Sequence, residues 1–308
     1  MYRRLILSQN ILTLAVHGGA WDIPDTLEQV HLKGMRSALS KGWEYLSQSG
    51  SALDAVEEAV FIMENDPVFD AGKGSVLNTD GSVEMDASIM DGKTLNAGAV
   101  AALRNFSNPI RISRKIMEKT EHILLAGKGC EEFALKQGFK KVPVEDLLTE
   151  RELLRLKELR KNQKYKTENS FSKKKGTVGA VAVDINGNIA AATSTGGTPK
   201  KIPGRVGDTP IIGCGTYAEN GVGGVSCTGW GESIMKTMLA KETAEQMRSG
   251  SSAQEAVEYA INLLHNRCDG LAGIICIDSK NGVGIYFNTP KMARGYMSSA
   301  QKEPVVEI

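Results

Sequence analysis

The sequence has no long hydrophobic run, few aromatic residues and no excess of charge of either sign. No apolar stretch approaches the roughly 20 residues that a membrane-spanning helix needs, so we expect no contact with a membrane. Aromatic residues make up 6% of the 308 residues, and the formal net charge is +1. A near-neutral chain lacks the basic surface of a nucleic-acid-binding protein, so we expect no nucleic-acid partner either.

Cysteine is also scarce, and its spacing excludes two structural classes. The five cysteines are scattered and form no C-x-x-C pair, which argues against a disulfide framework and against a zinc site. The segment Met1 to Gln9 has too short an apolar part for the core of a signal peptide, and we assign it no function. We therefore expect reduced thiols and a cytoplasmic location.

The common fingerprints of cofactor enzymes and hydrolases are missing as well. The chain contains no G-x-G-x-x-G, no Walker loop, no G-x-S-x-G and no H-E-x-x-H, so we expect no cofactor for catalysis. Apolar residues make up 41% of the chain and charged residues 24%, as in ordinary globular proteins. A chain of this length can bury a full core, as one large domain or two smaller ones.

Hydrophobic periodicity predicts an irregular order of strands and amphipathic helices. We expect strands at 12–16, 97–103, 178–183, 189–195, 222–227, 272–278 and 283–288. We expect helices at 27–49, 51–65, 145–165, 234–247 and 252–266, with two more inside 110–138 and a hairpin turn at Asp80-Gly81. A doubly wound sheet would show regular βαβ alternation, so an α+β fold of two packed sheets with helices outside, an αββα sandwich, is favoured.

The clearest change in composition lies just before residue 177. A charged connector at about 160–176 ends in NSFSKKK, which has no apolar period, and a run of small and β-branched residues follows. If the Gly176–Thr177 bond were cut, the free amine of Thr177 would lie beside its own hydroxyl and could take its proton. The alternative is that Thr177 simply opens a strand, as β-branched residues often do.

Other polar residues stand at strand ends around this threonine. A turn at Asn186-Gly187 predicts a hairpin that places Thr177 opposite Thr195. Thr228 and the backbone N–H of Gly229 could stabilise an oxyanion, although Thr228 could also be an ordinary hydroxyl at the end of a strand.

A polar loop contains both Arg205 and Asp208. An arginine fork suits a carboxylate and an aspartate suits an ammonium, so the pair could bind the α-amino-acid end of a substrate. The alternative is a surface ion pair. Near the N-terminus, His17 precedes two glycines, and it could be catalytic or could hold its loop through hydrogen bonds.

Together these motifs resemble the plant-type L-asparaginases with isoaspartyl peptidase activity, a family of threonine-type N-terminal-nucleophile hydrolases. The similarity covers nearly the whole chain, through HGGA (17–20), GSALDAVEEAV (50–60), NDP (65–67), VEMDASIMDG (83–92), GTVGAVAVD (176–184), ATSTGG (192–197), GRVGDTP (204–210) and TGWGE (228–232).

The resemblance implies one αββα domain, residues 1–308, which cuts itself before Thr177. The products would be an α subunit that ends at Gly176 and a β subunit of residues 177–308, and two such αβ units would form a homodimer. Thr177 would attack the side-chain amide of asparagine, or the isopeptide carbonyl of a β-aspartyl dipeptide, with its own amine as base and then acid. Thr195 would hold and polarise the nucleophile.

The resemblance also implies the substrate contacts. Arg205 would take the α-carboxylate and Asp208 the α-amine. Thr228 and the Gly229 N–H would form the oxyanion hole, and the carbonyl of Gly231 would help to hold the amine.

A structural sodium ion is also implied, bound by backbone oxygens, which are hard ligands. The matching carbonyls belong to Met63, Glu64, Asp66, Phe69, Ala71 and Lys73. The chain departs from the family pattern in two places, because Asp70 stands where the family usually has asparagine and residues 1–9 precede the usual start.

Two rival functions stay open. Glycosylasparaginases use the same nucleophile on glycan-linked asparagine, but they generally have asparagine at the position of Gly197, lack the HGGA start and are secreted with disulfides. The chain could also remain uncleaved and bind amino acids without turnover. The sequence does not decide between asparagine and β-aspartyl dipeptides as the preferred substrate, since both present the same aspartyl end.

Overall fold

The strands of the protein form two sheets, which we describe from a computed structural model covering residues 11–161, 176–301 and 303–308. Met1 to Gln9 and most of the connector 160–176 lie outside the described residues. The larger sheet has the spatial order β12 (Val305–Glu307), β11 (Lys291–Ser298), β1 (Thr13–Trp21), β5 (Val178–Val183), β6 (Ile189–Thr195), β2 (Met85–Asp91), β3 (Ala97–Leu103) and β4 (Leu124–Ala126). The smaller sheet has the order β10 (Val283–Phe287), β9 (Ala272–Asp278), β8 (Gly223–Gly229) and β7 (Thr216–Glu219). Neighbouring strands are antiparallel except for β3 and β4.

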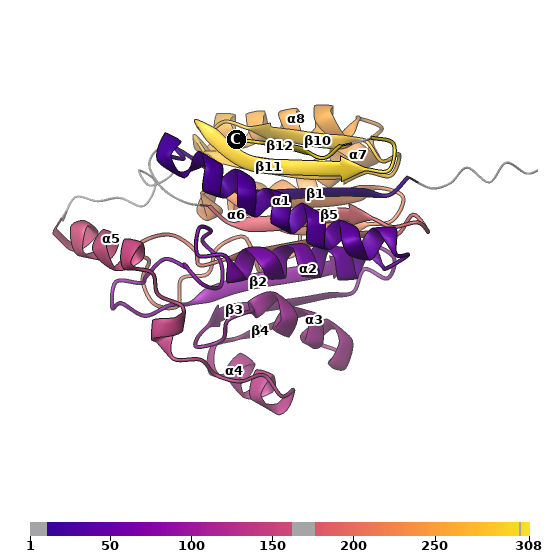
Figure 1. Cartoon of the computed structure of the whole chain (residues 1–308). Coiled ribbons are helices and arrows are strands. Elements are labelled where there is room, and N and C mark those ends of the chain that lie inside the picture. The colour runs from indigo at the N-terminus through magenta and orange to yellow at the C-terminus, as the bar shows by residue number, and fades with distance from the viewer. Residues whose placement is uncertain (1–10, 162–175, 302) are drawn as a thin grey trace, which may run out of the picture.

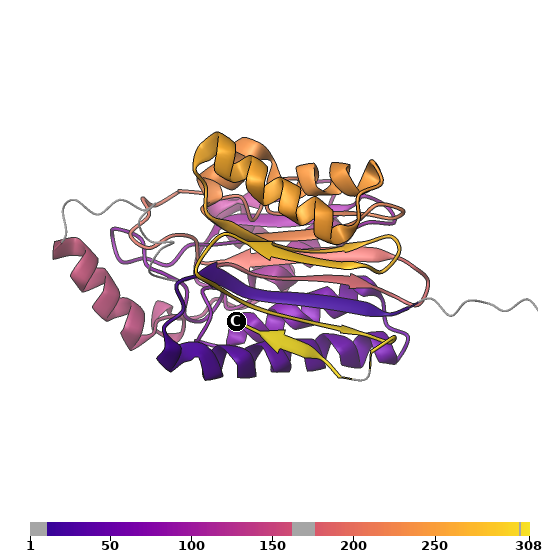
Figure 2. The same ribbon diagram turned by 90° about the horizontal axis from the view of Figure 1, so that it is seen from above.

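Helices cover the outer faces of both sheets, and the inner faces contact each other (Figures 1 and 2). The larger sheet carries α1 (Asp25–Ser47), α2 (Ala52–Asn65), α3 (Pro109–Lys119) and α4 (Gly127–Lys136). The smaller sheet carries α6 (Gly231–Thr237), α7 (Leu239–Arg248) and α8 (Ala253–Cys268). The short helix η1 (Val144–Asp146) and α5 (Glu150–Lys161) lead toward the connector, and α5 lies at one side of the molecule in Figure 2.

Strand β5 shows how the core is divided. All six of its residues are buried, and side chains alternate between the two faces of a strand. Val178, Ala180 and Ala182 pack in the cluster beneath the helices of the larger sheet. Val181 and Val183 belong to the second cluster, which lies against the smaller sheet. Because Thr177 is two residues before Gly179 and four before Val181, it shares their face and points between the sheets.

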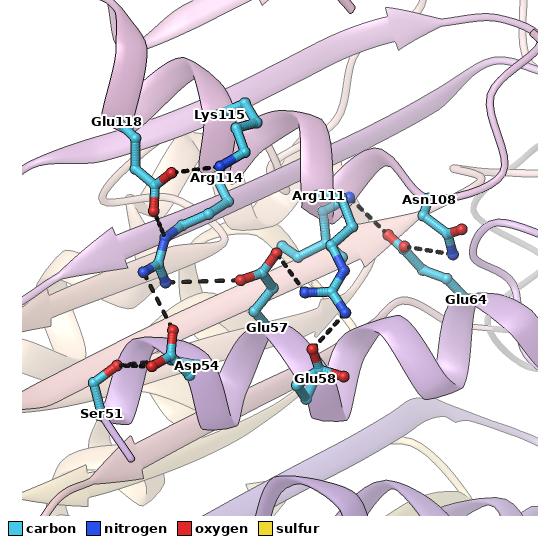
Figure 3. A network of polar contacts seen from close by, with 11 residues as sticks. Ser51, Asp54, Glu57, Glu58, Glu64, Asn108, Arg111, Arg114, Lys115 and Glu118 are labelled. Atoms are coloured by element: carbon cyan, nitrogen blue, oxygen red, sulfur yellow. Dashed lines mark hydrogen bonds and ion pairs between the residues drawn. The ribbon is translucent and has the colours of Figure 1, made fainter. Parts of the chain in front are cut away.

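Helices α2 and α3 are joined by charged side chains (Figure 3). The Arg111 guanidinium pairs with Glu57 at 2.9 Å and also with Glu58, and Arg114 pairs with Asp54 at 3.3 Å. The Ser51 hydroxyl accepts a hydrogen bond from the backbone N–H of Asp54, which confirms the predicted start of α2.

Several predictions about single elements are wrong for identifiable reasons. The predicted helix 234–247 is two helices, because Met238 adopts a left-handed φ of 49° between α6 and α7. The Asp80-Gly81 turn exists, with the Asn78 N–H donating to the Ser82 carbonyl at 2.9 Å, but the described residues beside it form no paired strands. The sequence analysis also missed β2, β4, β7, β11 and β12. The strands β4, β7 and β12 are short and lie at sheet edges, whereas β2 and β11 lie inside the larger sheet.

Two findings bear on the environment of the protein. All five cysteines are free thiols, as the sequence predicts. Within residues 11–161, 176–301 and 303–308, no helix combines the length and apolar character that crossing a membrane demands.

Candidate active site

Thr177 and Thr195 face each other where β5 begins and β6 ends. The β5–β6 register pairs Val178 with Ser194, which brings the two threonine hydroxyls to 3.1 Å, with Thr177 donating to Thr195. The backbone N–H of Gly197 donates to the same Thr195 oxygen at 2.9 Å. Thr177 is 7% exposed. The predicted pairing of these threonines is therefore confirmed.

Gly176 occupies a space that no larger residue would fit. A Cβ added to Gly176 would lie 2.7 Å from the Cα of Gly19 and 2.8 Å from the Thr228 hydroxyl oxygen. Gly19 has a φ of +105°, a conformation that favours glycine. Among the described residues, the buried Thr228 oxygen has no hydrogen-bond partner. Thr228 thus lies directly beside the Gly176–Thr177 junction with a free hydroxyl.

Gly229 and Gly231 follow Thr228 in the chain and lead toward the loop that carries Arg205 and Asp208. Gly229 ends β8 with a φ of +141°, and α6 begins at Gly231. A Cβ on Gly231 would lie 2.8 Å from Arg205 Nη2 and 2.8 Å from Asp208 Oδ1. The fold therefore brings Arg205, Asp208 and Gly231 into one cluster, three residues along the chain from Thr228.

Asp208 is a buried carboxylate with an open position. Its side chain is 4% exposed, and its Oδ2 has no hydrogen-bond partner among the described residues. Burial raises the pKa of Asp208 to about 7, against the lowering effect of the nearby Arg205 charge. An ammonium group placed at Oδ2 would supply the missing partner and would favour the ionised carboxylate.

Arg205 is not in a surface ion pair with Asp208, which corrects that interpretation of the loop. Its guanidinium makes a two-pronged contact with Glu232, from Nε at 3.0 Å and from Nη2 at 2.8 Å. Burial acts to raise the pKa of Glu232, but the hydrogen bonds and the charge of Arg205 lower it below its usual value. The sequence analysis contained Glu232 in the TGWGE motif without giving it a role, because partners 27 residues apart leave no local signal.

Two further charged residues near the site were missed. Asp86 is a fully buried residue of β2 that lies opposite Thr195 of β6. Its carboxylate accepts a hydrogen bond from the Ala102 N–H at 2.8 Å. Burial raises the pKa of Asp86, and the charges of Lys201 and Arg205 oppose this. Lys201 is 3% exposed, and its ammonium donates to the Glu84 carbonyl at 2.7 Å. Burial lowers the pKa of Lys201. The alternation of Glu84 and Asp86 with apolar neighbours in VEMDAS (83–88) was the available signal for an inward-facing carboxylate, whereas Lys201 had no such signal.

The loop predicted to hold sodium closes on itself beside the turn that follows Thr195. The Lys73 N–H donates to the Glu64 carbonyl at 2.7 Å, and the Phe69 N–H donates to the Asp66 carbonyl at 3.1 Å. The Gly196 N–H donates to the Asp70 carbonyl at 2.9 Å. The described residues contain no cluster of three His, Cys, Asp or Glu side chains that could hold a metal.

Backbone oxygens are therefore the donor set available to a cation in this loop. A carbonyl that accepts one hydrogen bond keeps a second lone pair, so the set fits an alkali ion in donor type. The implied carbonyls of Met63, Glu64, Asp66, Phe69, Ala71 and Lys73 all lie between the end of α2 and the left-handed Gly74.

Comparison with known proteins identifies the family of the chain. The chain matches the Asparaginase family over residues 10–307. It is 48% identical over 281 residues to the isoaspartyl peptidase/L-asparaginase of Xenopus laevis, covering 91% of this chain and 90% of that protein. It is 49% identical over 271 residues to the human protein of the same name, covering 87% of each, and 47% identical over 306 residues to the plant-type L-asparaginase of Thermococcus kodakarensis, covering 94% and 98%. The chain belongs to the asparaginase family.

Proposed function

We propose that the protein hydrolyses the side-chain amide of L-asparagine to L-aspartate and ammonia, and the isopeptide bond of β-aspartyl dipeptides. The observation that carries this proposal is the Thr177 hydroxyl, 3.1 Å from Thr195 at the start of a strand and beside the free Thr228 hydroxyl. The names of the relatives from Xenopus laevis, human and Thermococcus kodakarensis support the same substrates.

The nucleophile becomes active when the Gly176–Thr177 bond is cut. The new α-amine of Thr177 has an ordinary pKa of about 7.7–8.0, so a useful fraction is free base at neutral pH. The amine takes the hydroxyl proton as the oxygen attacks the amide carbonyl, and it then delivers that proton to the leaving nitrogen. Water cleaves the resulting ester to release aspartate. The Thr228 hydroxyl and the Gly229 N–H stabilise the oxyanion in both steps, and the Gly231 carbonyl helps to hold the amine.

Arg205 and Asp208 select the aspartyl end of the substrate. The open Oδ2 of Asp208 binds the α-ammonium, and the guanidinium of Arg205, held at one edge by Glu232, binds the α-carboxylate. Both proposed substrates present these two groups at the same distance from the scissile carbonyl, so one anchor serves both.

We further propose the finer structural assignments. The layers described above form the four-layer αββα sandwich of the N-terminal-nucleophile hydrolases, as a single domain 1–308 divided by cleavage into residues 1–176 and 177–308. Two αβ units pair as a homodimer in the cytoplasm, and the loop from Met63 to Lys73 holds a structural sodium ion.

Intact mass measurement tests the nucleophile most directly. Active protein should consist of two chains that break between Gly176 and Thr177, whereas a single uncleaved mass with full activity would overturn the mechanism. The mature protein should also be assayed with asparagine, a β-aspartyl dipeptide and a glycosylasparagine. A preference for the glycosylasparagine, or tight aspartate binding without ammonia release, would favour one of the two rival functions.

A further inference from the structure

A second row of polar residues lies one step deeper in the larger sheet than the nucleophile. The strand register aligns His17 on β1 with Gly179 on β5, Gly179 with Thr193 on β6, and Thr193 with Ser88 on β2. Residues two apart on a strand share a face, so this row lies on the same face as Thr177. It forms the floor beneath the candidate active site.

The smaller sheet contributes two hydroxyls to this floor. Ser226 on β8 and Thr216 on β7 are paired in the register of that sheet. Gly179 makes room for them, because a Cβ there would overlap the Ser226 hydroxyl and lie 2.5 Å from Nε2 of His17. A glycine in the middle of a central strand is unfavourable by itself, and here it permits a polar contact between the sheets.

These side chains form one continuous run of hydrogen bonds, which we call the buried hydroxyl chain. His17 Nε2 lies 2.8 Å from the Ser226 oxygen, which lies 2.8 Å from the Thr193 oxygen. Thr193 and Thr216 are 2.5 Å apart, Thr216 and Ser88 are 2.8 Å apart, and Ser88 reaches the Thr209 carbonyl at 2.6 Å. The five side chains that make these links are completely buried: His17, Ser226, Thr193, Thr216 and Ser88.

One end of the chain has a fixed donor. A carbonyl can only accept, so the Ser88 hydroxyl donates to Thr209 at 2.6 Å. At the centre, the Thr193 oxygen has three neighbours, because it also lies 3.4 Å from the Gly215 carbonyl. The other links join groups that can both donate and accept, so each of the four hydroxyls has a partner on either side.

His17 ends the chain as a neutral ring. Burial lowers the pKa of His17 to about 3, against the raising effect of the Thr177 backbone. The ring is therefore neutral at physiological pH and carries one proton. A raised pKa is the effect of a carbonyl that accepts from a ring N–H, so the ring is tied to Thr177 as well as to Ser226.

The two ends of the chain reach the two halves of the site. One end is the His17 ring, which lies against the backbone of Thr177. The other end is the carbonyl of Thr209, the residue next to Asp208. Next to this row, the same inner faces are packed with apolar residues, among them Ala15, Val181 and Val225. A continuous polar row beneath the site needs a reason beyond packing.

We propose that the buried hydroxyl chain is a positioning device that fixes the nucleophile strand β5 relative to the loop that carries Arg205 and Asp208. This inference rests on the proposed hydrolase function. A buried hydrogen-bond network orders the groups at its ends more strongly than an apolar layer does. Breaking it near Thr177 should affect turnover, and breaking it near Thr209 should affect substrate binding.

Kinetics of two alanine variants and a control test the proposal. Losing one buried partner should lower kcat about tenfold in Ser226→Ala, with KM changed less than about twofold. Ser88→Ala should instead raise KM about tenfold with kcat nearly unchanged. The control is Ser113→Ala, because Ser113 is equally buried and bonds the Ala87 carbonyl from the helix side of the same strand. It should leave both constants within about twofold.

A second pair of variants separates the hydroxyl from the space it fills. Thr193→Val removes the central hydroxyl at constant shape and should lower kcat and raise KM together, whereas Thr193→Ser should restore both. If Thr193→Val matched the wild type, or if Ser226→Ala and Ser88→Ala gave the same changes as Ser113→Ala, the proposal would be overturned. Wild-type protein that turns over neither asparagine nor a β-aspartyl dipeptide would instead refute the proposed function.

Nitrogen-15 NMR of histidine-labelled protein tests the continuity of the buried hydroxyl chain without using activity. The protein has only four histidines, and His17→Gln identifies the signals of interest. The His17 ring should stay neutral between about pH 5 and 9, well above its lowered pKa. Its ring-nitrogen resonances should shift in Ser88→Ala, at the far end of the buried hydroxyl chain, but not in Ser113→Ala. A ring that titrates in this range, or no shift in Ser88→Ala, would contradict the proposal.

Discussion

The two halves of the candidate site are built from different chemistry. The nucleophile half consists of the neutral hydroxyls of Thr177, Thr195 and Thr228, linked at 3.1 Å between the first two. The anchor half consists of charged groups, with Arg205 bound to Glu232 at 2.8 Å and Asp208 buried beside them. A new Thr177 amine would have an ordinary pKa of about 7.7–8.0, which suits a base at neutral pH.

Each half also keeps one buried polar atom without a partner. These atoms are the Thr228 hydroxyl oxygen and Oδ2 of Asp208, judged within the described residues. An unsatisfied buried polar atom lowers the free energy of unfolding, so each of these two positions reduces the stability of the native state. Changes in the nucleophile half should therefore alter the chemical step, whereas changes in the anchor half should alter binding and its pH dependence.

The largest effect is expected for Thr177→Ala. The variant loses the hydroxyl that attacks both its own chain and the substrate, so it should remain one chain and have no measurable turnover. Intact mass and ammonia release measure both. Thr177→Ser keeps a hydroxyl and should retain some cleavage. An uncleaved Thr177→Ala protein that still released ammonia would place the nucleophile elsewhere.

Arg205→Ala should be the most damaging change in the anchor half. If it leaves a buried carboxylate unpaired, substrate binding should weaken by about 2–5 kcal/mol, seen as a raised KM with self-cleavage intact. Arg248→Ala is a suitable control, since Arg248 also pairs with glutamates but is 40% exposed at its side chain. That control should change binding by less than about 0.5 kcal/mol. An unchanged KM in Arg205→Ala would remove Arg205 from the site.

The anchor should also respond to pH. Asp208 binds an ammonium only when it is ionised, and burial raises its pKa to about 7. The inhibition constant of the product aspartate should therefore rise below pH 7, by about tenfold for each pH unit at the limit. Asp208→Asn should bind aspartate weakly and should lack this titration. The idea fails if wild-type and Asp208→Asn proteins show the same pH dependence of aspartate binding.

The same carboxylate should have a smaller effect on stability, and in the opposite direction: a rise in pH improves aspartate binding but lowers the stability of the native state. In the unfolded chain an aspartate has a pKa of about 3.9, whereas burial raises the pKa of Asp208 to about 7 in the native state. The native state therefore binds the proton more tightly, and this contribution to stability is complete below pH 4 and is lost as pH rises through 7. Asp208→Asn should raise the melting temperature at pH 8, by roughly 2–4 °C for each kcal/mol gained, and have little effect at pH 4. Equal melting temperatures at pH 8 would show that the charge is compensated.

The sequence allowed the nucleophile half to be predicted better than the anchor half. Thr177 and Thr195 flank one hairpin, and the Asn186-Gly187 turn fixes their register, so local pattern was enough to pair them. The Arg205–Glu232 contact joins a loop to the first turn of α6, and Asp86 comes from a third element. Those positions depend on how the layers stack, which periodicity does not report.

The same distinction explains the errors in the fold. Apolar spacing showed which face of 234–247 is buried, but it could not show the reversal at Met238, where one residue takes a φ of 49°. The strand β12 is the edge of the larger sheet, β11 lies next to it, and both are only partly buried. Weak burial gives a weak alternating pattern, so the last two strands of the chain were missed.

The position of Gly176 has a consequence for how the enzyme would be switched on. The unbroken chain runs through the narrow space between Gly19 and the Thr228 hydroxyl, which is where an oxyanion would need to form. If this is the catalytic centre, as proposed above, the protein as synthesised blocks it with its own backbone. Scission alone would not open it, since the new carboxyl terminus must also withdraw, and a tail that stays in place would act as a tethered inhibitor.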